Sequence, residues 1–428
     1  MMNFREQTPS VRSISSFTVP KIAFETSPKG TLYFHEETKG IGAVSVFWLL
    51  PISKQLQTKA FQALAAVELL LSGGDGKSEH EILKHIEHLG ASVGNDSEQL
   101  YARIHFKCAK HVAVEVFEWV LHHVERAEYP IDEIERYGLI KKASIERRMQ
   151  TPAYWSDRKA KECLYNEIPW VGTFGALEDF SKLQQPDLEG FHQQYIKNSS
   201  GVLFFSGDVD EYQKQQFLSV WESYERPSFY WKLEDENTKN PTEDLGIISH
   251  PLLNSSQVSM RWMKHLGGLE ERETHKYSLL NMVLGGYFGS RLMQELREKQ
   301  GLTYGIGSYF KPLWKGRSWN ISGEMNSANT DKALLEIKNI ITDLQQTPIP
   351  EAELERAKRY YAGMFRSGFD GPFAQATKAL QTLVRNYSAQ YYAETLESIW
   401  NIDSSSLLQL AQNELNSNSF VKVVSGDV

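Results

Sequence analysis

Arg297 and Tyr304 are the side chains in this sequence best suited to bind or polarise a substrate. Glycines before them allow a close turn into a helix whose last turn carries Arg297, and Gly301 ends that helix and places Tyr304 on a strand. A guanidinium can hold a carbonyl or carboxylate with two parallel hydrogen bonds, and a phenol can donate to a developing oxyanion. Taken singly, Arg297 could instead pair with Glu298 or Glu295, and Tyr304 could be a half-buried strand residue.

A histidine-rich stretch, Glu79–His88, is a second candidate for chemistry, because it contains three histidines and three glutamates. Glu81, His85 and His88 could share one face of a helix and bind zinc, with Glu146 as a further ligand. The alternative, which we favour, is a solvated helix whose histidines lie on the surface.

The segment from Leu284 to Tyr309 has the sequence Leu-Gly-Gly-Tyr-Phe-Gly-Ser-Arg-Leu-Met-Gln-Glu-Leu-Arg-Glu-Lys-Gln-Gly-Leu-Thr-Tyr-Gly-Ile-Gly-Ser-Tyr. It resembles the Gly-x-x-Ser-Arg-Leu and Leu-Arg-Glu-Lys-x-Gly-Leu-x-Tyr pattern of the pitrilysin/insulinase family of zinc peptidases, processing-peptidase subgroup. The resemblance covers nearly the whole chain and implies a clam-shell chamber built from two such chains. It also implies that Arg297 and Tyr304 face the metal-bound scissile peptide.

The zinc motif of that family, His-x-x-Glu-His, does not occur in this sequence. Alignment on the end of the first helix puts Leu64, Val67 and Glu68 at the three motif positions. Leucine and valine have no lone pair for a metal, and Glu68 alone cannot hold Zn²⁺ or activate its water. Glu146 lies at about the right distance for the third ligand of the family, and we interpret it as a remnant or as an ordinary charged helix residue. We therefore expect no metal in this chain and zinc on a partner chain.

The elements that must position these residues recur in two halves of the chain. A helix predicted over 58–71 follows the strand that contains Val44-Ser-Val-Phe-Trp48. In the second half, Val258-Ser-Met-Arg-Trp262 corresponds to that strand. The segment 350–356, which opens with proline and ends with arginine, likewise corresponds to 130–136. The separation between the two matching segments along the chain is too long for a solenoid repeat and typical of duplicated domains.

We predict a first domain at 1–221 without a zinc motif, an interdomain linker at 222–250, and a homologous second domain at 251–428 that carries the Arg/Tyr pair. The linker assignment rests on the polar run from Glu234 to Asp244, which has a proline and no apolar periodicity. The predicted fold class is α+β. Each domain is expected to be a mostly antiparallel sheet packed with helices, and the resemblance implies that the two form half of the peptidase chamber.

Composition excludes several other classes of protein. The 428 residues, 41% of them hydrophobic, can bury a sizeable core, and the net charge of −8 offers no basic surface for nucleic acid. No run approaches the roughly 20 apolar residues of a membrane helix, and residues 1–16 lack the apolar core of a signal peptide, so cytoplasmic residence is expected. Cys108 and Cys163 have no metal-ligand spacing, and we predict two buried free thiols.

The sequence therefore predicts the non-catalytic subunit of a heteromeric metallopeptidase, inactive alone, which lends Arg297 and Tyr304 to the zinc site of a partner of similar length. The expected substrate is a short peptide or an unfolded polypeptide. The short turn at Gly285–Gly289 resembles the bacterial two-gene arrangement more than the mitochondrial subunit with its expanded glycine-rich loop. Two alternatives stay open, a non-enzymatic peptide-binding or scaffold homodimer and an independent zinc peptidase that uses the histidine-rich stretch. The retained Arg/Tyr pair favours the first interpretation, because a scaffold has no chemical use for it.

Overall fold

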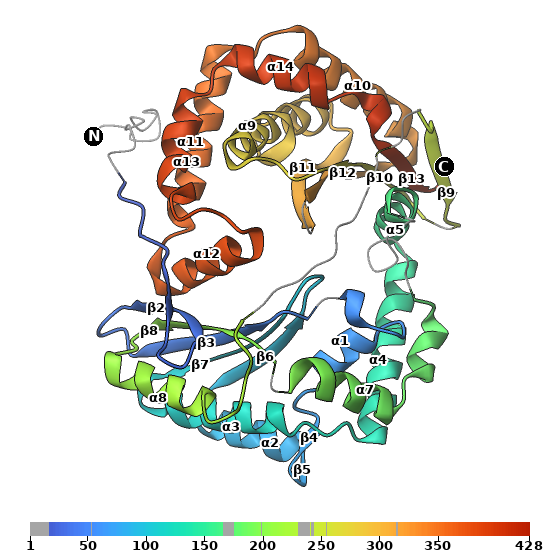
Figure 1. The fold of residues 1–428 in the computed structure, drawn as a ribbon. Coiled ribbons are helices and arrows are strands. Elements are labelled where there is room, and N and C mark those ends of the chain that lie inside the picture. The colour runs from blue at the N-terminus through green and yellow to red at the C-terminus, as the bar shows by residue number, and fades with distance from the viewer. Residues whose placement is uncertain are drawn as a thin grey trace, which may run out of the picture.

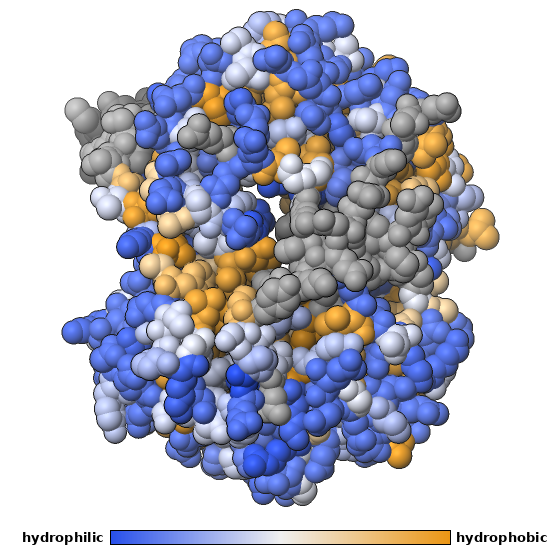
Figure 2. Space-filling view, in the orientation of Figure 1, coloured by the Kyte–Doolittle hydropathy of each residue, from blue (hydrophilic) through white to orange (hydrophobic). Residues whose placement is uncertain are grey.

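The computed structural model describes residues 17–52, 54–165, 175–197, 199–229, 240, 244–253, 255–313 and 316–428. Two halves face each other, each with a sheet toward the middle and helices toward the outer end of the molecule (Figure 1). Most of the polar run used to predict the linker, 234–244, lies outside the described residues, and a strand already begins at Ile247, inside the predicted linker. Polar residues cover the outer ends in Figure 2, whereas hydrophobic residues gather around the waist between the halves.

The sheet of the first half has six strands. Its order is β1 (Phe24–Thr26), β2 (Leu32–Glu37), β8 (Val202–Gly207), β3 (Ala43–Leu50), β7 (Ala102–Ala109) and β6 (Ser92–Ser97). Only the β2/β8 pair is parallel; the other neighbours run antiparallel. A small hairpin of β4 (Gly73–Gly74) and β5 (Lys77–Ser78) lies apart from this sheet.

The sheet of the second half repeats this topology without the first edge strand. Its order is β9 (Ile247–Pro251), β13 (Val421–Gly426), β10 (Gln257–Leu266), β12 (Gly316–Asn326) and β11 (Thr303–Leu313). Again one pair, β9 and β13, is parallel. The two segments matched in the sequence, Val44–Trp48 and Val258–Trp262, lie in the central strands β3 and β10. The predicted mixture of mostly antiparallel sheets and packed helices is confirmed.

Helices connect the strands in a similar sequence in both halves. Those of the first half are α1 (Gln62–Glu68), α2 (Glu79–His88), α3 (Ala113–Glu125), α4 (Ile131–Met149), α5 (Pro152–Leu164), α7 (Gln185–Phe191) and α8 (Glu211–Trp221). Those of the second half are α9 (Glu271–Asn281), α10 (Thr330–Gln346), α11 (Glu351–Ser367), α12 (Gly371–Arg385), α13 (Tyr391–Asn401) and α14 (Ser404–Glu414). Pro130 and Pro350 are the N-cap residues directly before α4 and α11, so the matched segments 130–136 and 350–356 both start a helix.

Two helices cross from one half to the other (Figure 1). Helix α5 leaves the first half and packs on β10 and β13, and α12 leaves the second half and packs on β2 and β8. The first contact buries Ala160, Leu164 and Tyr165 against Met263, Val421 and Val423. The second buries Ala376, Ala379 and Leu380 with Phe34, Phe47 and Phe204. Each sheet therefore completes its hydrophobic cover with a helix from the other half.

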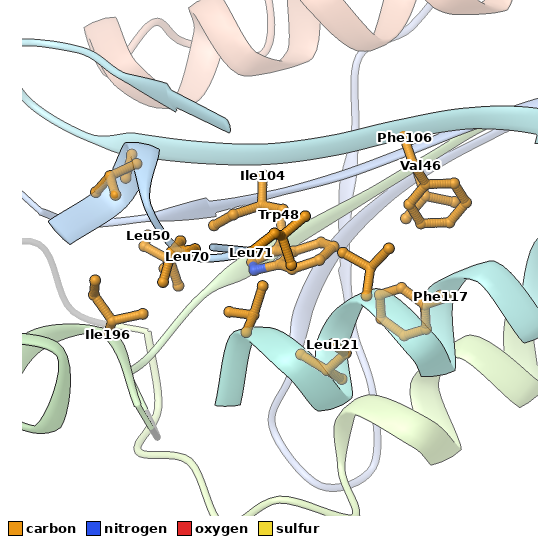
Figure 3. Close-up of a cluster of buried hydrophobic side chains, with 14 of the residues drawn as sticks. Val46, Trp48, Leu50, Leu70, Leu71, Ile104, Phe106, Phe117, Leu121 and Ile196 are labelled. Carbon is orange, nitrogen blue, oxygen red and sulfur yellow. The ribbon is translucent and has the colours of Figure 1, made fainter. Parts of the chain in front are cut away.

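The core of the first half lies between its sheet and α3 (Figure 3). Alternate residues of β3, among them Val46 and Trp48, point to this side, and the Trp48 ring meets Phe117 of α3 edge to face at 5.7 Å. Burial of such aromatic side chains supplies about 2–3 kcal/mol each before entropy is counted. This layer fixes the position of α1, whose Val67 is fully buried in the same cluster.

The sequence Ser-Gly-Asp-Val stands at the end of the last strand of each half, at 206–209 and 425–428, and its Ser and Gly are the final residues of β8 and β13. This repeat is not among those predicted above from the sequence. The glycine has a positive φ in both copies, 106° at Gly207 and 131° at Gly426. A Cβ at either glycine would lie 2.3 Å from a main-chain oxygen at or beside the start of the central strand. Only glycine fits this approach without displacement of the backbone.

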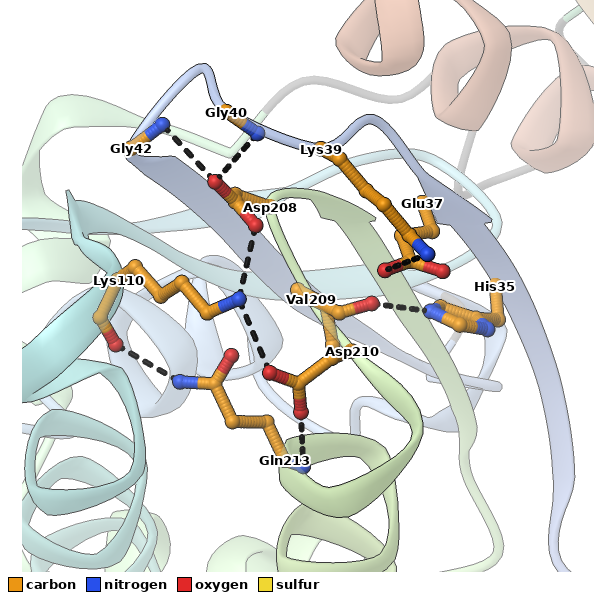
Figure 4. Close-up of polar contacts among 10 residues, drawn as sticks. All are labelled: His35, Glu37, Lys39, Gly40, Gly42, Lys110, Asp208, Val209, Asp210 and Gln213. Atoms are coloured by element: carbon orange, nitrogen blue, oxygen red, sulfur yellow. Dashed lines mark hydrogen bonds and ion pairs between the residues drawn. The ribbon is translucent and has the colours of Figure 1, made fainter.

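Asp208 fastens the end of β8 to the loop before β3 (Figure 4). Its Oδ2 accepts hydrogen bonds from the main-chain amides of Gly40 at 2.8 Å and Gly42 at 3.2 Å. Lys110 Nζ bridges Asp208 at 2.8 Å and Asp210 at 2.9 Å. The Lys110 ammonium and the amides hold the pKa of Asp208 below its usual value.

Two details of the first half differ from the sequence prediction. The helix predicted over 58–71 is shorter, because Phe61 takes a left-handed conformation with φ of 65° directly before Gln62. Cys108 is buried as predicted, but Cys163 is exposed, because α5 buries the face of Ala160 and Leu164. None of the described helices combines the length and apolar character that a bilayer-spanning segment requires.

Candidate functional site

The Arg/Tyr segment forms two π-helical pieces followed by a strand. η5 (Met282–Gly286) continues α9, η6 (Met293–Lys299) carries Arg297, and β11 carries Tyr304. Gly301, with φ of 61°, separates η6 from β11, so the predicted helix end and the strand position of Tyr304 are confirmed. π-helical turns are rare and are often found at functional sites.

A buried polar network fixes β11 against η5. Asn281 Oδ1 accepts hydrogen bonds from Ser308 Oγ at 2.7 Å and from Trp319 Nε1 at 3.0 Å, and Asn281 Nδ2 donates to the Ser308 carbonyl at 3.0 Å. Gly285 allows the close approach, since a Cβ there would lie 2.5 Å from Ser308 N. Because these groups are buried and mutually satisfied, β11 has one defined position relative to η5. Asn281 and Ser308 could not be identified from sequence patterns, since they are 27 residues apart.

Arg291, the arginine of Ser-Arg-Leu, fixes the start of η6. Its Nε and Nη2 donate to the two Glu353 oxygens at 2.8 and 3.0 Å, and its Nη1 donates to Asp343 at 2.6 Å. The Arg291 side chain is 15% exposed. Its donors are therefore occupied by α10 and α11, which makes Arg291 a structural residue.

Arg297 and Tyr304, by contrast, present their polar groups to solvent. The Arg297 side chain is 42% exposed; its Nε lies 3.6 Å from Glu298 Oε1, and its Cζ lies over the Phe288 ring, 5.1 Å from the centroid. Tyr304 is 82% exposed, not half-buried, and within the described residues its hydroxyl has no hydrogen-bond partner. The structure shows no hydrogen bond between the two side chains. Because neither side chain makes a hydrogen bond to another described residue, both can bind an external group.

The positions that align with the zinc motif lie on α1 and do not fit a metal. Val67 is fully buried in the hydrophobic core, and Leu64 is partly buried on the same helix. Glu68 is engaged by Lys141 of α4, whose Nζ lies 2.6 Å from Glu68 Oε2. Two apolar side chains and one paired carboxylate do not make a Zn²⁺ site.

Helix α4 turns a lysine toward the motif position of α1. Lys141 Nζ also lies 5.3 Å from the centroid of the Tyr137 ring, and burial together with the Glu68 carboxylate raises the pKa of Tyr137. Glu146, the proposed remnant of a third ligand, is exposed further along α4. The cation that pairs with the Glu68 carboxylate is therefore the Lys141 ammonium group and not a metal ion.

The histidine-rich stretch forms α2, and its side chains have separate roles. Glu81 closes a capping box, in which its Oε2 accepts hydrogen bonds from Ser78 N at 2.9 Å and Ser78 Oγ at 2.7 Å. The His85 ring packs on Trp119 with centroids 4.0 Å apart, and His88 Nδ1 lies 3.2 Å from a carbonyl in its own helix. Within the described ranges, no three His, Cys, Asp or Glu side chains are grouped to hold a metal. The structure gives the independent zinc site no support.

Comparison with known proteins agrees with this geometry. A family model described as Peptidase M16 inactive domain matches residues 182–361, which include both Arg297 and Tyr304. An uncharacterized zinc protease of Rickettsia bellii is 22% identical over 355 residues, 79% of this chain and 80% of the relative. The non-peptidase homolog YmxG of Helicobacter pylori is 22% identical over 224 residues, 49% of this chain and 48% of the relative.

Solved structures share the fold over almost the full length. A peptidase M16 inactive domain from Pseudomonas fluorescens has a TM-score of 0.84 at 20% identity, with 95% of this chain and 98% of the other covered. A protease from Helicobacter pylori has a TM-score of 0.82 at 17% identity, with 95% of this chain and 100% of the other covered.

Proposed function

We propose that this chain, whose residues 182–361 match the peptidase M16 inactive domain, is the non-catalytic subunit of a two-chain metallopeptidase of the pitrilysin/insulinase (M16) family. The partner is a family member of similar length with an intact His-x-x-Glu-His motif, which carries the zinc ion. The observation that carries the proposal is a contrast. Tyr304 is 82% exposed and its hydroxyl has no partner among the described residues, whereas the motif positions on α1 are packed or paired. The bacterial origin of the relatives is consistent with a bacterial two-chain peptidase.

In this proposal the chain contributes two groups to the partner's active site. The Arg297 guanidinium binds a carbonyl or carboxylate of the peptide through its N–H donors. The Tyr304 hydroxyl donates a hydrogen bond to the oxygen that becomes negatively charged as the peptide bond is attacked. The zinc ion on the partner supplies the activated water. Short or unfolded peptides are the expected substrates.

The test is peptide hydrolysis by the co-expressed pair of chains. Tyr304→Phe removes one transition-state donor and should lower kcat on the order of 100-fold while the complex keeps its size. Arg297→Ala should raise KM as well, because it removes a substrate anchor. Tyr212→Phe is the matched control, since Tyr212 is 73% exposed on α8, far along the chain from the segment. Normal kinetics in both Arg297→Ala and Tyr304→Phe, with intact complexes, would refute the proposal and favour a peptide-binding scaffold.

The chain alone should bind no stoichiometric zinc and cleave no peptide, because its motif positions lack ligands. Elemental analysis of the purified protein checks the first point. About one zinc per chain that is lost in His85→Ala or His88→Ala would contradict the proposal and restore the independent zinc site.

A further inference from the structure

Among the described residues, the Arg297 guanidinium contacts one carboxylate weakly and one aromatic ring, and the ring is the main restraint on its orientation. Its closest carboxylate, Glu298, is 3.6 Å away and 42% exposed, a separation and exposure at which an ion pair contributes well below about 1 kcal/mol. The Phe288 ring lies under the guanidinium, 5.1 Å from ring centroid to Cζ. That distance is within the range in which a cation–π contact is attractive.

The backbone of the loop that presents Phe288 is held by its surroundings. Gln294 Nε2 donates to the Phe288 carbonyl at 3.1 Å, and the neighbouring Tyr287 ring packs on Tyr360 of α11 with centroids 4.7 Å apart. Ser290 N donates to the Tyr287 carbonyl at 3.1 Å and closes the turn. The loop before η6 therefore has a fixed shape, although the Phe288 side chain it presents is 55% exposed.

The mode of contact determines what Arg297 can still do. A ring engages the face of a guanidinium and leaves the N–H donors at its edge free, whereas a carboxylate occupies those donors. Arg291, six residues earlier, shows the second case, because Glu353 and Asp343 take its donors. Arg297 is closer to the first case: the ring restrains its orientation, and within the part of the chain that the structure describes its donors make no hydrogen bond, although the Glu298 carboxylate lies 3.6 Å from Nε.

We infer that Phe288 is a positioning residue, whose ring orients the Arg297 guanidinium so that its free edge meets a carbonyl or carboxylate of the peptide substrate. This inference rests on the proposed function, in which Arg297 binds substrate at the partner's zinc site. Phe288 acts through Arg297 and touches no reacting atom.

The test compares Phe288→Leu with Phe288→Tyr in the complex with the zinc-bearing partner. Loss of an exposed cation–π contact should raise KM about three- to fivefold and leave kcat nearly unchanged, and the tyrosine ring should restore the wild-type value. In an Arg297→Ala background, Phe288→Leu should add nothing, because its effect passes through the guanidinium. Tyr212→Leu is the control for the loss of an exposed ring elsewhere.

A spectroscopic measurement on the full chain without its partner reports the contact directly. The Arg297 Nε–Hε resonance, assigned with Arg297→Lys, should move on Phe288→Leu and stay close to its position on Phe288→Tyr. If Arg297→Ala impairs hydrolysis but Phe288→Leu does not, or if the two effects simply add, the inference is refuted and the proposed function stands. If neither substitution changes hydrolysis while the resonance still moves, the contact exists but both the inference and the proposed function are wrong.

Discussion

Substitution of Arg291 by methionine should destabilise the second half of the protein by about 3 kcal/mol. The substitution leaves the Glu353 carboxylate, 19% exposed, without its bidentate partner, and removal of one member of a buried pair costs about 3–5 kcal/mol. We expect the lower end because Glu353 retains some solvent contact. Loss of the ion pair with Asp343 adds only about 0.5 kcal/mol, since that carboxylate is 56% exposed. The stability of Arg291→Lys should lie between that of Arg291→Met and that of the wild type, because lysine keeps the charge but cannot make the bidentate contact.

Urea unfolding of the full chain measures this effect, and Glu353→Leu completes a double-mutant cycle. Replacement of both partners by apolar groups should recover most of the loss, because no unpaired charge then remains. Arg359→Met is the matched control: this α11 arginine is 54% exposed and lies 3.9 Å from Glu355, so the change should stay within about 0.5 kcal/mol. A loss below about 1 kcal/mol for Arg291→Met, or a double variant as unstable as the sum of the single ones, would refute the buried-pair reasoning.

Three further predictions concern the stability of the first half. Gly207→Ala should lower the free energy of unfolding, measured by thermal melting, by about 2–3 kcal/mol, because φ is 106° and the added Cβ meets a carbonyl oxygen at 2.3 Å. The control is Gly363→Ala in α11, which has open space around it and should be neutral or slightly stabilising in the same assay. Burial lowers the pKa of His123 in the folded protein. The contribution of the neutral ring to the free energy of unfolding is therefore full above about pH 6.5 and is lost as the pH falls from there toward the folded-state pKa. The urea midpoint of the wild type should drop between pH 7.5 and 5.5, and that of His123→Gln should drop less. Arg226→Met should cost about 3 kcal/mol in urea unfolding, because it removes the guanidinium that pairs with the Glu125 carboxylate, which is 4% exposed; an unchanged midpoint would show that this pair does not stabilise the fold.

Local signals in the sequence were enough to predict much of the fold. Pro130 and Pro350 mark helix starts because proline restricts its own φ whatever surrounds it, and the copied order of elements reveals the duplication. The contacts that build the site could not be predicted, because Arg291 and Glu353 are 62 residues apart and nothing in either neighbourhood specifies the other. Cys163 was wrongly predicted to be buried, because helical periodicity does not say which sheet a helix will cover.

The site residues divide in the same way. The segment that carries Arg297 and Tyr304 could be located by its resemblance to a family, and the structure adds what each side chain touches. The Phe288 ring under Arg297 had a possible signal, since nine residues separate them along one loop and helix, but only the π-helical path of η6 brings them together. The pairing of Lys141 with Glu68 could not be predicted from the sequence, because α1 and α4 meet through tertiary packing alone.

The exchange of α5 and α12 between the halves has a consequence for the order in which the protein is made on the ribosome. Helix α5 leaves the ribosome long before β10, and β13, the second strand it covers, is synthesised later still. Until then the apolar face of Ala160 and Leu164 has no sheet to cover. The first half therefore cannot reach its final packing during its own translation, and the nascent chain exposes the apolar face of α5 until β10 and β13 have been made, a state that is prone to aggregation.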